Sequence, residues 1–303
     1  MGTPDFAVAS LKSIVESGFN VVAVITAPDR PAGRGQKLQE SAVKTYAVEK
    51  GLPVLQPTNL KSPDFQTELA SYKADIQVVI AFRMLPEAVW DMPRLGTFNL
   101  HASLLPAYRG AAPINRAIMN GEKETGVTTF FLKHEIDTGN IIFQEKIAIS
   151  EDDTAGSLHD KLMNLGAELV VKTLNAVEAG DYPQEQQSNP EGTPTAPKIF
   201  KPDCKIDWAK SAVEVRNHIR GLSPYPAAWT SLGGKGLKVF QTSFVEFLDE
   251  RQPGSIHTDG KHFLYVKCQD AYLSLEELQI EGKKRMGVEE FLRGYNGEVL
   301  INP

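Results

Sequence analysis

The stretch Ile76-Gln77-Val78-Val79-Ile80-Ala81-Phe82 is nearly all apolar and has the length of a β-strand. Strands that are apolar at successive positions are buried on both faces, as in a parallel sheet covered by helices. Thr97-Phe98-Asn99-Leu100-His101 reads as a further strand, and up to about residue 180 short β-branched runs alternate with segments of helical periodicity. This alternation indicates an α/β fold.

The segments around these two strands continue the same pattern. Helices are expected where a capping residue or a proline precedes an apolar stripe, namely from Thr3-Pro4 to Gly18, from Ser41 to Gly51, from Ser62-Pro63 onward and from about Thr154 to Ala179. Further strands are expected at 21–26, 127–132 and 141–149. We therefore predict a Rossmann-like domain, a mostly parallel sheet with helices on both faces.

A polar, proline-rich stretch without periodicity follows at residues 181–197 and reads as an extended linker. Beyond it lie one expected helix, Ser211 to Arg220, and several short strands separated by glycine-containing turns. This pattern predicts a smaller C-terminal β-barrel of the OB-like kind. The predicted organisation is a first domain at 1–180, a linker at 181–197 and a second domain at 198–303.

Composition excludes several classes of protein. The 303 residues carry 32 basic and 38 acidic side chains, a net charge of -6, which argues against a basic surface along the whole chain but leaves room for a local one. Cys204 and Cys268 have no zinc-site spacing, so neither a disulfide framework nor a structural metal is expected. The apolar runs are too short to span a membrane, and the first residues do not resemble a secretory leader. We expect a cytoplasmic protein.

Three polar residues near strand ends could carry chemistry. Asn99 and His101, two apart in a strand, project from the same face, and the loop after them marks the carboxyl end where open parallel sheets place ligands. Asp137 follows another strand at a turn. An amide and an imidazole can stabilise the oxyanion of a tetrahedral intermediate, and a nearby carboxylate favours the charged imidazole. Together they suggest acyl transfer to an amine, although His101 alone could be a buried structural histidine and Asp137 part of a plain turn.

Other chemistries fit less well. Asp137-Thr138-Gly139 is also an aspartic-protease motif, but that mechanism needs a second such carboxylate, which the sequence lacks. No Gly-x-Ser-x-Gly elbow is present and neither cysteine has an activating neighbourhood, so direct transfer is favoured over a covalent acyl-enzyme. Gly33-Arg34-Gly35 lacks the third glycine of a dinucleotide-binding loop.

Longer motifs around these residues resemble a known family. They are Asn99-Leu100-His101-Ala102-Ser103-Leu104-Leu105-Pro106, Tyr108-Arg109-Gly110-Ala111-Ala112-Pro113-Ile114 and Asp137-Thr138-Gly139. With this spacing the chain resembles the 10-formyltetrahydrofolate-dependent formyltransferases. The resemblance implies that Asn99, His101 and Asp137 are catalytic, and that 10-formyltetrahydrofolate donates the formyl group without a metal. It also implies a folate site made of Arg83, Met84, Leu85, Ser103, Leu104, Leu105 and Pro106.

Further segments resemble the members of this family that act on tRNA. They are Gly2-Thr3-Pro4-Asp5-Phe6, the basic loop Pro28 to Gly35, and Ser223-Pro224-Tyr225-Pro226-Ala227-Ala228-Trp229. This implies that the acceptor is the α-amino group of methionyl initiator tRNA, with no membrane and no obligate protein partner. The implied tRNA contacts are Arg30, Arg34 and Lys37 in a loop that orders on contact, and Lys198, Lys201 and Lys205 after the linker.

Three other functions remain to be compared with this one. A 10-formyltetrahydrofolate hydrolase would share the three catalytic residues but would need neither the basic loop nor a second domain. A sugar-nucleotide formyltransferase would differ only in its acceptor, and the C-terminal segment from Asp207 to Trp229 disfavours it. An RNA-binding protein without catalysis would have no reason to carry Asn99, His101 and Asp137.

The beginning of the sequence departs from this family. Relatives start with a short apolar strand that ends in Gly-Thr-Pro, whereas here Met1 stands immediately before Gly2. The first strand of the sheet would then be missing, and its central position would stay empty, which leaves backbone groups on both neighbouring strands unpaired. We expect that the natural start lies upstream of Met1.

Overall fold

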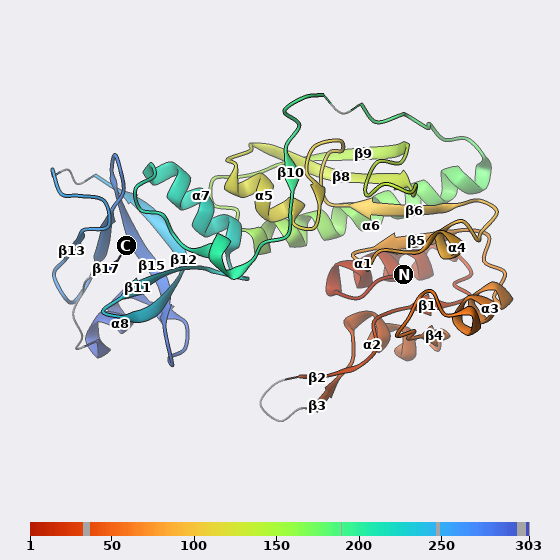
Figure 1. Ribbon diagram of the computed structural model, residues 1–303, viewed down its shortest axis with the longest axis horizontal. Helices are drawn as coiled ribbons and strands as arrows, with labels where there is room; N and C mark the ends of the chain where they lie inside the picture. The colour runs from red at the N-terminus through yellow and green to blue at the C-terminus, as the bar shows by residue number, and fades with distance from the viewer. Residues whose placement is uncertain (33–36, 189, 247–248, 296–300, 303) are drawn as a thin grey trace. The chain divides into compact units, whose positions relative to one another are not determined.

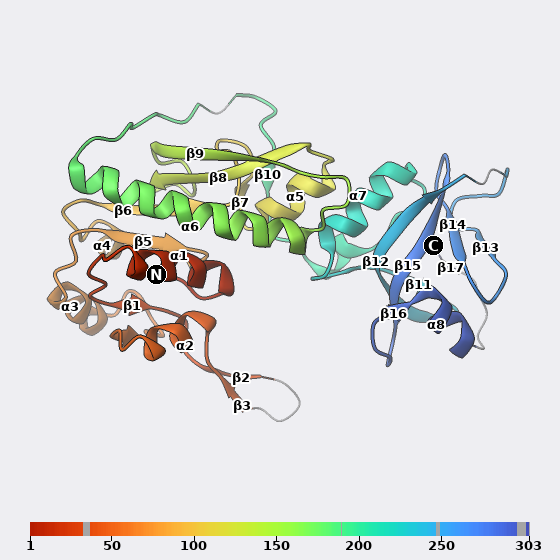
Figure 2. The ribbon, with the colours of Figure 1, turned by 180° about the vertical axis from the view of Figure 1, so that it is seen from behind.

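The computed structural model describes residues 1–32, 37–188, 190–246, 249–295 and 301–302 (Figures 1 and 2). The chain forms two compact units. Unit 1 comprises Met1–Gly110, Thr125–Ile147 and His159–Thr195, and unit 2 comprises Ala111–Glu124, Ala148–Leu158 and Ala196–Pro303. Neither unit is continuous in the sequence, and the boundaries 1–180, 181–197 and 198–303 remain a prediction.

Parallel strands form the centre of unit 1. Strand β1 (Val24–Ile25) pairs in parallel with β4 (Val54–Leu55), and β5 (Gln77–Ile80) pairs in parallel with β6 (Thr97–His101). Beyond β6 lie β8 (Glu124–Phe131), which is antiparallel to β6, and then β9 (Ile141–Ala148). The predicted α/β fold class is confirmed.

The helices of unit 1 begin near the residues that the sequence suggested. They are α1 (Asp5–Glu16), α2 (Ala42–Glu49), α3 (Pro63–Ser71), α4 (Glu87–Trp90) and the long α6 (Ala155–Ala179), whose first residues belong to unit 2. The Ser41 hydroxyl caps α2 by accepting a hydrogen bond from the Lys44 N–H at 3.1 Å. This bond satisfies one of the donors that a helix leaves free at its N-terminus.

Helices cover both faces of the sheet because side chains alternate along its strands. On one face Leu100 lies so close to Gly166 of α6 that a β-carbon there would be 2.6 Å from Leu100 Cδ2. On the other face Val79 belongs to the core cluster formed with Phe65 of α3 and Val89 of α4. Residue pairs directly opposite in register share a face, so Asn99, opposite Val79, lies on the α3 side. The catalytic candidates Asn99 and His101 therefore face away from α6.

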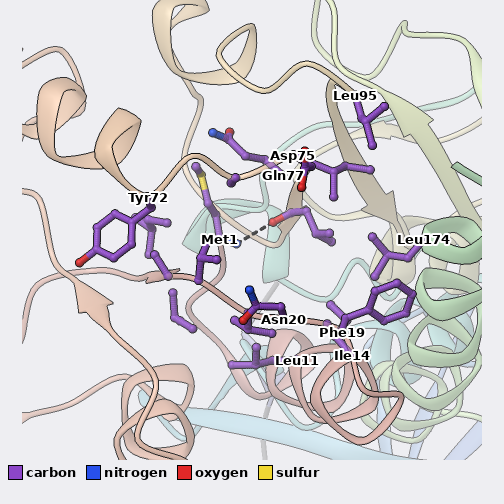
Figure 3. A pocket seen from close by; sticks show the side chains of 18 of the residues that line it. Met1, Leu11, Ile14, Phe19, Asn20, Tyr72, Asp75, Gln77, Leu95 and Leu174 are labelled. Atoms are coloured by element: carbon purple, nitrogen blue, oxygen red, sulfur yellow. Dashed lines mark hydrogen bonds between the residues drawn. The ribbon is translucent and has the colours of Figure 1, made fainter. Parts of the chain in front are cut away.

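The first two residues lie between β1 and β5. The Met1 amino group donates to the Val78 carbonyl at 2.6 Å, the Ile80 N–H donates to the Met1 carbonyl at 2.9 Å, and the Gly2 N–H donates to the Ile25 carbonyl at 3.0 Å. A cavity of about 590 Å³ extends from Met1 between the segments that precede β1 and β5 (Figure 3). The strand predicted at 21–26 is reduced to β1, Val24–Ile25, because its pairing on this side stops at Gly2.

A short hairpin follows β1. Strand β2 (Arg30–Ala32) pairs antiparallel with β3 (Lys37–Gln39), with Arg30 opposite Gln39. Asp29 lies just before this hairpin and accepts hydrogen bonds from Lys44 of α2 and from Gln56. These contacts tie the start of the hairpin to the rest of unit 1.

Unit 2 is built on an antiparallel sheet. Its strands are β11 (Ala228–Leu232), β12 (Lys235–Val245), β13 (Ile256–Thr258), β14 (Leu264–Lys267), β15 (Tyr272–Ile280), β16 (Met286–Gly287) and β17 (Ile301–Asn302). They lie in the order β13-β14-β15-β12-β11-β17, and β16 pairs with β15. The register of β12 against β15 shifts between Val239 and Thr242, at a β-bulge or similar irregularity. The predicted β-rich second domain is confirmed.

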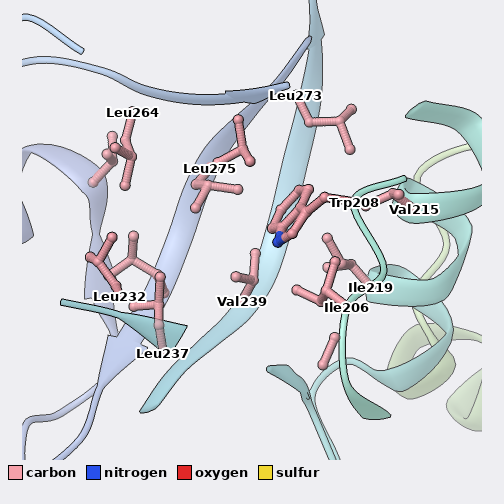
Figure 4. Packing of buried hydrophobic residues seen from close by; sticks show 14 of the residues in the cluster. Ile206, Trp208, Val215, Ile219, Leu232, Leu237, Val239, Leu264, Leu273 and Leu275 are labelled. Carbon is pink, nitrogen blue, oxygen red and sulfur yellow. The ribbon is translucent and has the colours of Figure 1, made fainter. Parts of the chain in front are cut away.

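Helices complete the core of unit 2. They are α5 (Pro113–Met119), the 3₁₀ turn η1 (Lys201–Cys204), α7 (Ala212–Leu222) and α8 (Val288–Gly294). Trp208, Ile219 of α7 and Val239 of β12 pack together in the buried cluster shown in Figure 4. Ser211 and Glu214 form a capping box that fixes the start of α7. Within the described ranges, no helix is both long and apolar enough to cross a membrane.

Candidate active site

The site begins at the carboxyl ends of β5 and β6. These strands are parallel neighbours, so the loops after Ile80 and His101 leave the sheet at the same edge. His101 is the last residue of β6 and is 7% exposed, whereas Asn99 is half-buried. Both side chains project from one face of the strand because they are two residues apart.

The structure brings His101 and Asp137 together. The closest atoms are His101 Nδ1 and Asp137 Oδ2, 3.8 Å apart and both largely buried. This distance exceeds a hydrogen bond but allows an ion pair when the imidazole is protonated. The other ring nitrogen, Nε2, lies 2.8 Å from the Tyr108 carbonyl oxygen. Since a carbonyl can only accept, Nε2 carries a proton, and Nδ1 is the nitrogen that can gain or lose one beside Asp137.

The backbone around Asp137 is shaped to present the carboxylate. Asp137 has φ 57°, a left-handed conformation that Asp tolerates better than most residues. Its Oδ2 accepts a hydrogen bond from the Gly110 N–H at 3.0 Å. Gly139 packs so tightly against β8 that a β-carbon would lie 1.5 Å from the Phe131 carbonyl oxygen. The Asp-Thr-Gly motif thus needs its glycine for a close backbone approach.

Gln187, from a distant segment of the chain, holds the loop that carries Asp137. Its side-chain amide donates to the carbonyls of Asp137 and Gly139 at 2.9 and 2.7 Å, and its Oε1 accepts from Arg109 Nε and Nη2 at 3.1 and 2.6 Å. Nearby, Glu185 and Ile141 exchange two backbone hydrogen bonds. Gln187 lies in the stretch that the sequence marked as a linker, so sequence reasoning missed it. A polar, proline-rich composition gives no signal for such a contact.

The loop after His101 is held by its own hydrogen bonds. The Ser103 hydroxyl donates to the Ala107 carbonyl at 2.6 Å. The Thr128 hydroxyl donates to the Ser103 carbonyl at 2.6 Å and accepts from the Leu105 N–H at 3.1 Å. The Leu105 side chain is buried with Phe130 in a small core cluster. Ser103 and Leu105 therefore support the loop, and Leu104 and Pro106 are half-buried.

The loop after β5 carries the other predicted folate residues. Arg83 donates to the backbone carbonyls of Pro57 and Thr58, the latter at 3.0 Å, and so ties two loops together. Leu85 is buried in the α3–α4 core cluster. The Met84 side chain is 69% exposed. Of these three residues, Arg83 and Met84 are exposed enough to contact a ligand through their side chains, whereas Leu85 is buried. The folate role of the whole set stays a prediction.

The basic residues expected to meet RNA lie in both units. Arg30 is exposed in β2, and the Lys37 backbone lies in β3. Arg34 lies outside the described residues. In unit 2, Lys198, Lys201 and Lys205 are all exposed. Lys201 Nζ lies 5.9 Å from the centroid of the Trp229 ring, whose Nε1 donates to the Lys201 carbonyl at 3.0 Å.

Both thiols are poor nucleophiles. Cys204 and Cys268 are buried and free, and burial raises the pKa of Cys268 to about 12 and raises that of Cys204 as well. Among the residues that the structure describes, no three or more His, Cys, Asp or Glu side chains gather closely enough to hold a metal ion.

Fold and site together define an α/β enzyme whose polar residues gather at the carboxyl edge of a parallel sheet, with a second, β-rich domain. The chain belongs to the formyl transferase family. Residues 1–174 match the formyl transferase domain and residues 198–296 match the formyl transferase C-terminal domain.

Several relatives are similar along nearly their whole length. A methionyl-tRNA formyltransferase of Bacteroides fragilis is 54% identical over 304 residues, which cover 98% of this chain and 94% of that protein. Proteins of the same name from Phocaeicola vulgatus and Flavobacterium johnsoniae are 56% and 51% identical, with 97% of this chain and 94% of each relative covered.

Solved structures share the fold at lower identity. WlaRD, a sugar 3N-formyl transferase, superposes with a TM-score of 0.68 at 21% identity, covering 93% of this chain and 97% of that one. An N-formyltransferase of Helicobacter canadensis gives a TM-score of 0.67 at 22% identity over 90% and 96% of the two chains. This likeness supports the fold, and at such identity it carries no information on the acceptor.

Proposed function

We propose that this protein transfers the formyl group of 10-formyltetrahydrofolate to the α-amino group of methionyl initiator tRNA, for translation initiation. The observation that carries the proposal is the identity of 51 to 56%, along nearly the whole of both chains, with proteins named methionyl-tRNA formyltransferase. The sugar N-formyltransferases share the fold at only 21 to 22% identity. The same reasoning favours work in the cytoplasm, where initiator tRNA is charged.

In the proposed reaction His101 handles the proton. The methionyl amine attacks the formyl carbon, and the bond from that carbon to the folate nitrogen breaks after a tetrahedral intermediate. His101 Nδ1 is the ring nitrogen free to take the amine proton, since Nε2 is bonded to the Tyr108 carbonyl at 2.8 Å. The imidazolium formed in this way would face Asp137 Oδ2, which stabilises its charge. The His101 imidazolium then donates this proton to the folate nitrogen as the bond from that nitrogen to the formyl carbon breaks.

In the proposed reaction Asn99 stabilises the oxyanion. Its amide is a neutral donor on the same strand face as His101, and we assign it to the oxyanion of the intermediate. Asn99 is half-buried, so a bound formyl group can reach it from the open edge of the sheet. The donor substrate is assigned to the loops after β5 and β6, with Met84 as an apolar contact and Ser103, Leu105 and Arg83 holding the loop backbone in place.

The acceptor RNA is assigned to basic residues of both units. In unit 2, Lys205 bridges in parallel to Trp229, and Trp229 lies opposite Lys238 on the neighbouring strand. Directly opposite residues share a sheet face, so this row presents two lysines around one aromatic ring, with Lys201 against the same ring. Phosphates favour lysines, and unpaired bases stack on aromatic rings. This row supports the role proposed for Lys201 and Lys205, and Lys198 is proposed beside them as an exposed lysine.

A test with four acceptors separates the candidate functions. Formyl-labelled donor is incubated with the protein and charged initiator tRNA, charged elongator tRNA, an amino-sugar nucleotide or buffer alone. We expect label on methionyl initiator tRNA, with less on the elongator tRNA. Preferential label on the sugar nucleotide would mean that an amino sugar, and not methionyl tRNA, is the acceptor. Release of labelled formate at the same rate in all four mixtures would mean that the protein is a hydrolase.

A further inference from the structure

Lys44 holds both ends of the β2–β3 hairpin. Its ammonium group pairs with the carboxylate of Asp29, which precedes β2, and lies 2.9 Å from Oε1 of Glu40, which follows β3. Asp29 is also fixed from a second side, since its Oδ1 accepts a hydrogen bond from Gln56 Nε2 at 2.8 Å. The same amide donates to the Ala27 carbonyl at 2.9 Å. Lys44, Asp29, Glu40 and Gln56 thus form a clamp at the base of the hairpin.

No third strand flanks this hairpin among the residues that the structure describes, where β2 and β3 pair only with each other. Arg30, Leu38 and Gln39 are exposed, and the hairpin projects from the rest of unit 1 in both views (Figures 1 and 2). Two-stranded hairpins without a core of their own are marginally stable in water. The direction of the hairpin therefore depends on the contacts at its base.

The position of Lys44 in α2 indicates which contacts it serves. Lys44 lies in the first turn of the helix, where the helix dipole favours anions, so a lysine there does not stabilise the helix itself. Its side chain is 17% exposed and that of Asp29 is 24% exposed. Hydrogen bonds from Lys44 and Gln56 lower the pKa of Asp29, and those to Asp29 and Glu40 raise the pKa of Lys44. Lys44 and Asp29 are therefore both charged at neutral pH.

The clamp also sets Arg30 near the loop after β5. Arg30 follows Asp29 directly in the chain. Burial, and then the positive charge of Arg30, lower the pKa of Arg83 in that loop. Arg83 in turn donates to the carbonyl of Thr58, two residues after Gln56, at 3.0 Å. An RNA phosphate bound at Arg30 would thus lie near the loops assigned to the formyl donor.

We propose that Lys44 is a positioning residue for the acceptor RNA, because its pairing with Asp29 and Glu40 holds the basic hairpin in the direction in which Arg30 meets the RNA backbone. The inference rests on the proposed function, which makes RNA the acceptor. Lys44 itself is not the RNA contact, since two carboxylates already share its ammonium group. Breaking the clamp should therefore weaken RNA binding and leave donor use unchanged.

The experiment breaks the clamp from either side. Lys44→Met removes the cation and Asp29→Ala removes the carboxylate, whereas Lys44→Arg keeps a cation for both carboxylates. The matched controls are Lys12→Met and Glu16→Ala, which break an exposed ion pair of α1 with the same changes of charge. Three quantities are measured for each protein: the dissociation constant for methionyl initiator tRNA, the KM for the donor, and amide hydrogen exchange in β2 and β3.

We expect Lys44→Met and Asp29→Ala each to raise the dissociation constant by about ten-fold and to speed up exchange in the hairpin by about five-fold or more. The sign for Asp29→Ala separates the clamp from plain electrostatics, because loss of a negative charge beside RNA should otherwise strengthen binding. Lys44→Arg and both controls should bind within about two-fold of the unaltered protein. KM for the donor should not change in any of them.

Equal or tighter RNA binding by Asp29→Ala would overturn the inference, and so would unchanged hydrogen exchange in the hairpin of both clamp variants. If Lys44→Met does not fold, Asp29→Ala carries the test alone. If the unaltered protein formylates the tRNA and the clamp variants bind it equally well, only this inference fails. If the unaltered protein does not bind methionyl initiator tRNA, the proposed function fails and this inference fails with it.

Discussion

The carbonyl oxygen of Tyr108 lies 2.8 Å from Nε2 of His101 and thereby fixes the protonation of that ring. Because the carbonyl accepts, the proton of the neutral imidazole resides on Nε2, and Nδ1 faces Asp137. A backbone group thus orients the ring and fixes its tautomer. Asp137 then acts chiefly through its charge.

Replacing His101 by Ala should lower kcat by roughly 100-fold or more, since the proton acceptor and a transition-state charge are both lost. Donor binding should change little. His134→Ala is a matched control, because His134 is an exposed histidine that pairs with Glu87. Steady-state kinetics of all three proteins check the prediction, and equal kcat values would remove His101 from the mechanism.

Asp137→Asn keeps the shape of the side chain and an acceptor for the Gly110 N–H, but removes the negative charge. We expect kcat to fall by about 10- to 100-fold because the imidazolium of the transition state loses its partner. Tm should stay nearly constant. If Tm instead falls so far that the variant is unfolded at the assay temperature, the loss of activity would show that Asp137 is needed for folding.

Gln187→Ala removes the amide that holds the Asp137 and Gly139 carbonyls. We expect kcat to fall by about ten-fold through misplacement of Asp137, with KM for the donor unchanged. Gln186→Ala, an exposed neighbour in the same segment, should behave as the unaltered protein. Equal kinetics for the two variants would mean that Gln187 does not position the site.

Lys238→Glu should weaken use of the tRNA. Reversing the charge opposite Trp229 should raise KM for methionyl tRNA about ten-fold at low salt, with a smaller effect at high salt. KM for the donor should not change. Lys261→Glu is the control, because Lys261 is an exposed lysine in the turn between β13 and β14. If both substitutions raise KM for methionyl tRNA equally, the effect of Lys238 would come from general surface charge and not from a contact beside Trp229.

The sequence predicted local structure well where one segment carries its own signal. Strand β6 has the predicted bounds, Thr97 to His101, and α6 begins one residue after Thr154. The strand predicted at 21–26 is only Val24–Ile25, because a strand also needs neighbours, and its pairing partner on one side ends at Gly2. Hydrophobic pattern cannot report such a dependence.

The candidate active site could be predicted only in part, because some of its contacts join segments that are far apart in the sequence. Asn99, His101 and Asp137 are recognisable by residue type and by position near strand ends. The Tyr108 carbonyl acts through a backbone atom, which residue type does not reveal, and Gln187 reaches the site from a segment whose polar, proline-rich composition predicts only a linker. Both contacts depend on how distant segments meet in the folded chain.

Formyl transfer to methionyl initiator tRNA, with His101 as the proton acceptor, is tested by identifying the product of a single turnover. The protein is mixed with excess charged initiator tRNA and isotopically labelled donor, the aminoacyl bond is cleaved, and the released amino acid is identified by mass spectrometry. We expect labelled N-formylmethionine with the unaltered protein and almost none with His101→Ala. Unformylated methionine together with labelled formate, or undiminished formylation by His101→Ala, would contradict this expectation.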